Sequence, residues 1–168
     1  MGEDESGGTM EASEWAQQKA QSIHAARAAD EIRTALNLER QRIRTSNFPD
    51  LVEAVARAFQ HHCEEYNKIR AHGERSVEFH AIGPSLYMLR RDAGLSEINM
   101  RVNLSSCTIR VTAERSGLRY DRVYHPEALA NGTALLSSSN GGSLVRAEDV
   151  AQEAMDAFLD GQELAERL

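Results

Sequence analysis

The sequence is poor in aromatic residues, cysteine and proline. Aromatic side chains make up 5% of its 168 residues, and it holds two cysteines and three prolines. With so few aromatics, the core must be built mainly from aliphatic residues and alanine. Two thiols are too few for the disulfide framework of a small secreted domain, so we expect Cys63 and Cys107 to be reduced core residues.

Long hydrophobic runs and an excess of positive charge are also missing. No stretch approaches the roughly 18 consecutive apolar residues of a membrane span, and the first residues lack the basic-then-apolar layout of a secretory signal. The net charge of -7 disfavours binding to nucleic acid or to an anionic membrane. We therefore expect a cytoplasmic protein with no membrane contact and no nucleic-acid partner.

Motifs for catalysis are absent as well. The chain has no Gly-x-Ser-x-Gly elbow and no glycine-rich phosphate loop. Its densest cluster of reactive side chains is His61-His62-Cys63-Glu64-Glu65, in which His61 and Glu65 share one helix face. A zinc or iron site needs three or four converging ligands, and nothing in the spacing requires a third. We assign no catalytic residue, no metal site and no cofactor.

What the sequence does contain is a strict alternation of apolar and polar residues over 98–113, interrupted at Ser105-Ser106. A period of two on both sides of a short turn predicts two half-buried antiparallel strands joined as a hairpin. With Ser105-Ser106 as the turn, Met100 lies opposite Val111 on the apolar face. The same register places Arg101 opposite Arg110 on the polar face, with Asp121 of the next strand diagonal to Arg110.

Two helices precede this hairpin. Residues 12–45 contain neither proline nor glycine and predict a helix with a weak apolar stripe. A helix with so little apolar surface either lies over the sheet, largely in water, or packs against a second copy of the chain. A much stronger stripe predicts a second helix over 48–71, with Asn47 as its N-cap and Pro49 in its first turn. The stripe consists of Val52, Val55, Phe59, Cys63, Tyr66 and Ile69.

Short connectors joining the strands predict a meander, with Pro126 ending the fifth strand. The expected strands cover about 76–82, 86–91, 96–104, 107–115 and 118–125, with a sixth around 133–137 and a helix over 146–159. The fold class is therefore α+β: two N-terminal helices, an antiparallel meander of five to six strands and a C-terminal helix in a two-layer sandwich. We expect residues 1–11 to form a disordered acidic tail, 12–160 a single domain and 161–168 a loose C-terminal tail.

Two sets of residues are candidates for binding. Arg101 and Arg110 present guanidinium groups to an anion or a protein partner, if the polar sheet face is not simply solvated. Tyr120, Arg122 and Tyr124 fall on the core side of the fifth strand, where a charge needs a partner. With His62, they line a pocket if the sheet curves strongly enough beneath the helices.

Three functions compete on these grounds, of which nucleic-acid binding through Arg101 and Arg110 is disfavoured by the net charge. The sequence favours a non-catalytic protein-interaction or regulatory module that forms a homodimer through the helix at 12–45 or a sheet edge. The alternative is a small-ligand-binding protein or an enzyme whose pocket lies between the curved sheet and the helices. A pocket containing Arg122 and His62 would distinguish the second function from the first.

Overall fold

The computed structural model describes residues 11–70, 72–73, 76–91, 96–115 and 118–166. Most of the predicted acidic tail at 1–11, and the last two residues of the chain, lie outside this range. The chain divides into two units, 1–40 and 41–168. The first unit contains the helical residues up to Arg40, and the second contains the remaining helix, the sheet and the core.

The two helices predicted over 12–45 and 48–71 are one helix, α1, which spans Ala12–Ile69 with Pro49 inside it. Asn47 therefore does not cap a new helix; its side-chain amide donates to the carbonyl of Ile43 at 2.8 Å. Proline removes one helical hydrogen bond. Burial compensates for this loss, because Phe48 and Val52 on either side of Pro49 are 1% and 6% exposed.

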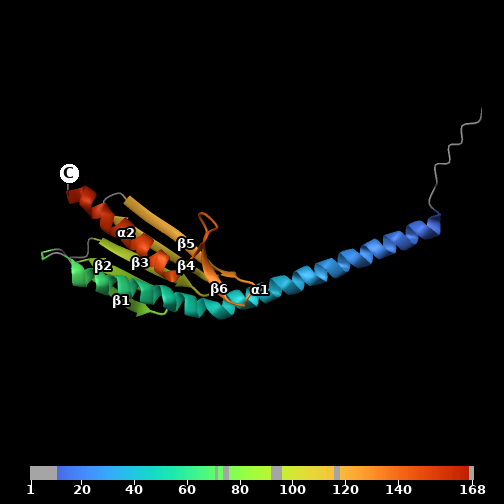
Figure 1. Cartoon of the computed structure of the whole chain (residues 1–168), viewed down its shortest axis with the longest axis horizontal. Helices are drawn as coiled ribbons and strands as arrows, with labels where there is room; N and C mark the ends of the chain where they lie inside the picture. The colour runs from blue at the N-terminus through green and yellow to red at the C-terminus, as the bar shows by residue number, and fades with distance from the viewer. Residues whose placement is uncertain (1–10, 71, 74–75, 92–95, 116–117, 167–168) are drawn as a thin grey trace, which may run out of the picture. The chain divides into compact units, whose positions relative to one another are not determined.

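The sheet has seven antiparallel strands instead of five to six, and each strand pairs with the next one along the chain (Figure 1). This order confirms the predicted meander. The strands are β1 Val77–Gly83, β2 Leu86–Arg91, β3 Ser96–Asn103, β4 Thr108–Arg115, β5 Leu118–Ala128, β6 Ala134–Ser138 and β7 Leu144–Val145.

The hairpin of β3 and β4 has the predicted register but a longer turn. Met100 lies opposite Val111 and Arg101 opposite Arg110, as the alternation requires. Pairing ends at Asn103 and Thr108, so the turn has four residues instead of two. Cys107, predicted to be a core strand residue, lies in this turn with a φ of 49°. The side chain of Asn103 stabilises the turn by accepting a hydrogen bond from the Ser106 N–H at 3.1 Å.

Pro126 does not end β5, which continues to Ala128. The pairing of β4 with β5 stops at Ile109 and Tyr124, and Pro126 then pairs with Leu136 of β6. At Pro126, β5 pairs with β6 alone, so the missing N–H of the proline costs no ladder hydrogen bond on the side where β4 has ended. The far edge of the sheet is formed by β7, which has two residues.

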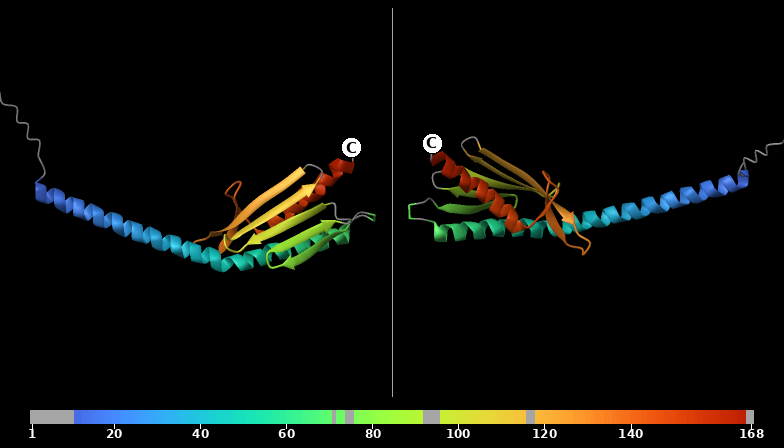
Figure 2. Two further views of the ribbon diagram at one scale, coloured as in Figure 1. Left: turned by 180° about the vertical axis from the view of Figure 1, so that it is seen from behind. Right: turned by 45° about the horizontal axis from the view of Figure 1, so that its top comes forward.

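Helix α2 spans Ala147–Glu166 and thus passes Asp160-Gly161, where the sequence predicts its end. Its first turn is capped by Asp149, whose carboxylate accepts a hydrogen bond from the Arg146 N–H at 3.1 Å. Both α2 and the part of α1 in the second unit cover one face of the sheet (Figure 2). The two-layer α+β architecture is confirmed. Between the layers lie Phe59, Ile98 and Phe158, each at most 2% exposed.

Candidate functional site

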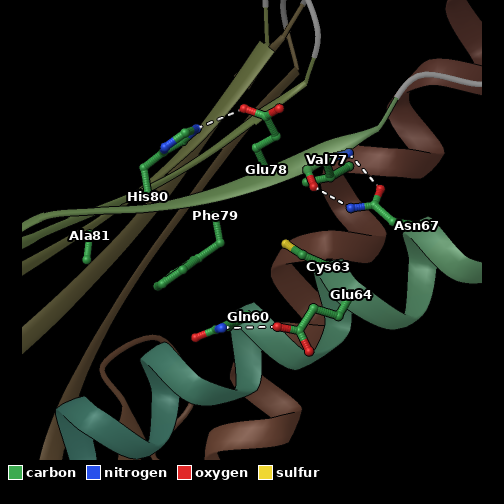
Figure 3. A pocket seen from close by; sticks show the side chains of 9 residues that line it. All are labelled: Gln60, Cys63, Glu64, Asn67, Val77, Glu78, Phe79, His80 and Ala81. Carbon is green, nitrogen blue, oxygen red and sulfur yellow. Dashed lines mark hydrogen bonds and ion pairs between the residues drawn. The ribbon is translucent and has the colours of Figure 1, made fainter.

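The second unit contains a groove of about 580 Å³ between α1 and the free edge of the sheet (Figure 3). We call it the edge groove. One wall is the last part of α1, and the other is β1, which pairs with β2 alone. The edge groove is lined by Gln60, Cys63, Glu64, Asn67, Val77, Glu78, Phe79, His80 and Ala81.

Asn67 joins the two walls at one end of the edge groove. Its side-chain amide accepts a hydrogen bond from the Val77 N–H at 2.9 Å and donates one to the Val77 carbonyl at 2.7 Å. A neighbouring strand would make the same pair of bonds. The backbone groups of Val77 therefore point away from β2, because an N–H that donates to Asn67 cannot also donate across the ladder.

In an antiparallel pair of strands, the backbone N–H and C=O groups of successive residues point alternately toward the partner strand and away from it. Register is continuous from Val77 to Ala81, so Phe79 and Ala81 also point their backbone N–H and C=O groups away from β2. Among the residues that the structure describes, no side chain or backbone group bonds to these outward groups. They are the hydrogen-bonding groups of an unpaired sheet edge.

The side chains of β1 divide the edge groove into an apolar floor and an acidic rim. Phe79 points toward α1, whereas Glu78 and His80 point away from it (Figure 3). The ring of Phe79 stacks on Tyr87 of β2, with 6.1 Å between the ring centroids. The charges on the rim are those of Glu64, on α1, and Glu78, which lies 3.2 Å from the His80 ring nitrogen.

Cys63 contributes its sulfur to the floor but is not a reactive thiol. It is 3% exposed, and burial, assisted by the charge of Glu64, raises the pKa of the thiol to about 12. A thiol that stays protonated near neutral pH is neither a nucleophile nor a metal ligand. Its place in the edge groove is therefore that of a small apolar side chain.

The predicted arginine pair lies on the exposed face of β3 and β4. Arg110 donates hydrogen bonds from Nε and Nη2 to the two carboxylate oxygens of Asp121, at 2.9 Å and 2.6 Å. This interaction confirms the diagonal relation predicted from the register, and it raises the pKa of Arg110. Arg101 is exposed and has no polar partner in the described part of the chain. Anion binding at this pair stays a prediction, with Arg101 as its free cation.

Three of the four predicted pocket residues lie together near α2. The hydroxyls of Tyr120 and Tyr124 are 3.0 Å apart, and Arg122 lies over the Tyr120 ring at 5.3 Å from its centroid. Arg122 also reaches Glu153 of α2 at 3.5 Å, with both side chains partly in water. Burial raises the pKa of both phenols.

The fourth predicted pocket residue, His62, lies on α1 and bonds through its ring to the Ala58 carbonyl at 2.8 Å. None of the four lines the edge groove. Their role as a ligand site stays a prediction. The sequence analysis did not find the edge groove, although the sequence of β1, VEFHAIG, contains none of the lysine or proline residues that protect sheet edges.

In the first unit, every residue of α1 from Ala12 to Arg40 is exposed. The exposed residues include large apolar side chains at 49–62% of their full accessible area: Trp15, Ile23, Ile32, Leu36 and Leu38. This segment of α1 makes a helix about 43 Å long at 1.5 Å per residue.

The residues that the structure describes contain no group of three or more His, Cys, Asp or Glu side chains placed to hold a metal ion. Within the same residues, no helix is both long and apolar enough to cross a membrane. The chain shows no significant match to a protein-family model, to a curated protein or to a solved structure.

Proposed function

We propose that this protein is a non-catalytic interaction module that self-associates through residues 12–40 of α1. The observation that carries this proposal is the full exposure of that segment, large apolar side chains included. In proteins, most helical stability comes from packing of an apolar face and not from propensity. A helix of this length with no packing contact in its own unit is best explained by a partner helix.

A second copy of the chain is the partner that the segment fits. Ala25, Ala29, Ile32 and Leu36 form a stripe at spacings of four, three and four residues, and its alanines allow two helices to approach closely. The segment carries equal numbers of opposite charges, so two copies do not repel each other. The charges are Glu14, Asp30, Glu31 and Glu39 against Lys19, Arg27, Arg33 and Arg40.

Sedimentation equilibrium of the full chain tests this proposal. We expect a dimer that becomes monomeric when Ile32→Lys and Leu36→Lys are combined, because each lysine replaces about 1–2 kcal/mol of apolar burial per chain with a charge. The matched control combines Thr34→Lys and Gln41→Lys, which add the same charge on the opposite helix face and should leave the dimer intact. A wild-type monomer throughout the micromolar range, or equal dissociation by both double variants, would refute self-association through this stripe.

A further inference from the structure

We propose that the edge groove binds an extended, basic segment of a partner protein as an additional strand beside β1. This site is separate from the helical segment proposed for self-association, and each is tested independently. Three features support it: the outward backbone groups of Phe79 and Ala81, the apolar floor next to them, and the acidic rim.

The backbone groups supply the attraction that is independent of sequence. An extended peptide lying beside β1 forms main-chain hydrogen bonds with Phe79 and Ala81, as in strand addition to other exposed sheet edges. Natural sheets protect such edges with short strands, lysine or proline. The opposite edge, β7, is protected by its two-residue length, whereas the seven residues of β1 contain no lysine, arginine or proline.

The side chains around the edge groove define the chemistry of the peptide. Alternate peptide residues face α1 and pack on Phe79 and Cys63, so they must be apolar. The residues between them point away from α1, on the side of β1 where Glu78 lies. Glu64, on α1, adds a second negative charge to the lining of the edge groove. No lysine or arginine is among the lining residues, and nearby Lys68 is held by Glu65 at 2.6 Å. Charge complementarity therefore selects lysine or arginine alternating with apolar residues.

Asn67 disfavours a second copy of the chain paired through β1 about Phe79. If two β1 strands paired in antiparallel fashion about Phe79, Ala81 of one copy would lie opposite Val77 of the other. The N–H and C=O of that Val77 are already bonded to Asn67. In that register a second copy gains only the Phe79 pair, whereas an independent peptide pairs with Phe79 and Ala81 together.

Amide hydrogen exchange of the full chain provides the first test. In the free protein, the amides of Phe79 and Ala81 should exchange more than about tenfold faster than those of Glu78 and His80, which face β2. The probe is the synthetic peptide acetyl-Lys-Val-Lys-Val-Lys-Val-Lys-amide, and its addition should slow exchange at Phe79 and Ala81. Protection of these two amides before the peptide is added, relieved by dilution, would instead assign the edge to a second copy and overturn the proposal.

Titration calorimetry with variants and control peptides provides the second test. Ala81→Pro removes an outward N–H without removing a bond to β2, and it should weaken binding about fivefold to tenfold. Glu78→Lys should weaken binding severalfold in low salt, whereas Asp156→Lys, the same charge change on α2, should have no effect. Circular dichroism checks that each variant is folded, and Phe79→Ala replaces Ala81→Pro if the proline variant is not.

The control peptides separate backbone pairing from charge. An analogue with glutamate in place of lysine should not bind measurably, and one with proline in place of valine should not protect the Phe79 and Ala81 amides. The proposal is overturned if the lysine–valine peptide fails to bind. The proposal is also overturned if neither Glu78→Lys nor Ala81→Pro (or Phe79→Ala in its place) weakens binding, because the peptide would then occupy another surface.

Discussion

The two hydrogen bonds between Asn67 and Val77 are the clearest point at which to perturb the edge groove. Replacing Asn67 with alanine removes both, and each is worth about 0.5–1.5 kcal/mol net. Val77 is 1% exposed, but the edge groove gives water access to its backbone once the amide is gone. We therefore expect a loss of about 2 kcal/mol in the free energy of unfolding, or roughly 4–8 °C in Tm.

Urea unfolding followed by circular dichroism measures this loss. The matched control is Gln60→Ala, which removes an amide from the same helix and the same groove but breaks only an exposed hydrogen bond to Glu64. That control should cost less than about 0.5 kcal/mol. If Asn67→Ala lowers the free energy of unfolding no more than Gln60→Ala does, the hydrogen bonds to Val77 do not hold β1 against α1.

The variant Asn67→Asp tests whether the side chain at position 67 must donate a hydrogen bond to the Val77 carbonyl as well as accept one from the Val77 N–H. A protonated carboxyl can accept from the Val77 N–H and donate to its carbonyl, whereas a carboxylate repels that carbonyl. The folded state therefore raises the pKa of the new aspartate above its unfolded value. The free energy of unfolding of Asn67→Asp is compared with that of Asn67→Ala at each pH. The difference should favour Asn67→Asp most below the pKa of the aspartate in the unfolded state, and it should shrink as the pH rises through the higher pKa in the folded state. An opposite slope would contradict the contact geometry.

Three further outcomes follow from the core and its ionisable groups. Phe59→Ala should lower the free energy of unfolding by about 3–5 kcal/mol in urea titration, because Phe59 is fully buried and its removal leaves a cavity; a cost below about 1 kcal/mol would contradict this packing. In the native protein, a disulfide reagent should react with Cys107 much faster than with Cys63, and similar rates would show that Cys63 is accessible. Because the pKa values of Cys63, Tyr120 and Tyr124 are all raised on folding, the unfolded state loses these protons first. Stability should therefore fall as the pH rises above about 9, as urea midpoints measured against pH will show, and a flat profile would refute it.

The sheet was largely predictable from sequence because its signal is local. Alternation over 98–113 set which residues face the core, and the opposed pairs followed from the position of the turn. The turn is longer than predicted, but the register is unchanged, because each strand loses one residue, Leu104 from β3 and Cys107 from β4. The meander was predictable for the same reason, since short connectors join neighbouring strands, but the sequence left open whether the last strand returns beside the first.

The continuity of α1 was not predictable from the same local signals. Asn47 and Pro49 together are typical of a helix start, and only the burial of Phe48 and Val52 against the sheet explains why the helix continues. The edge groove was missed for a similar reason. Asn67 lies ten residues before Val77 and has no sequence feature that marks its two backbone contacts. Tertiary contacts decided both cases, and they are invisible in a single sequence.

The consecutive order of the seven strands also bears on how the chain folds. Each strand pairs with one that precedes or follows it directly, so each sheet contact closes only a short loop and requires little ordering of the chain. Pairings that close short loops can form strand by strand as the polypeptide emerges during synthesis. Helix α2 is made after all seven strands. The parts of β3, β4 and β5 that α2 contacts therefore stay uncovered until α2 is made, and during that interval the nascent protein is vulnerable to aggregation.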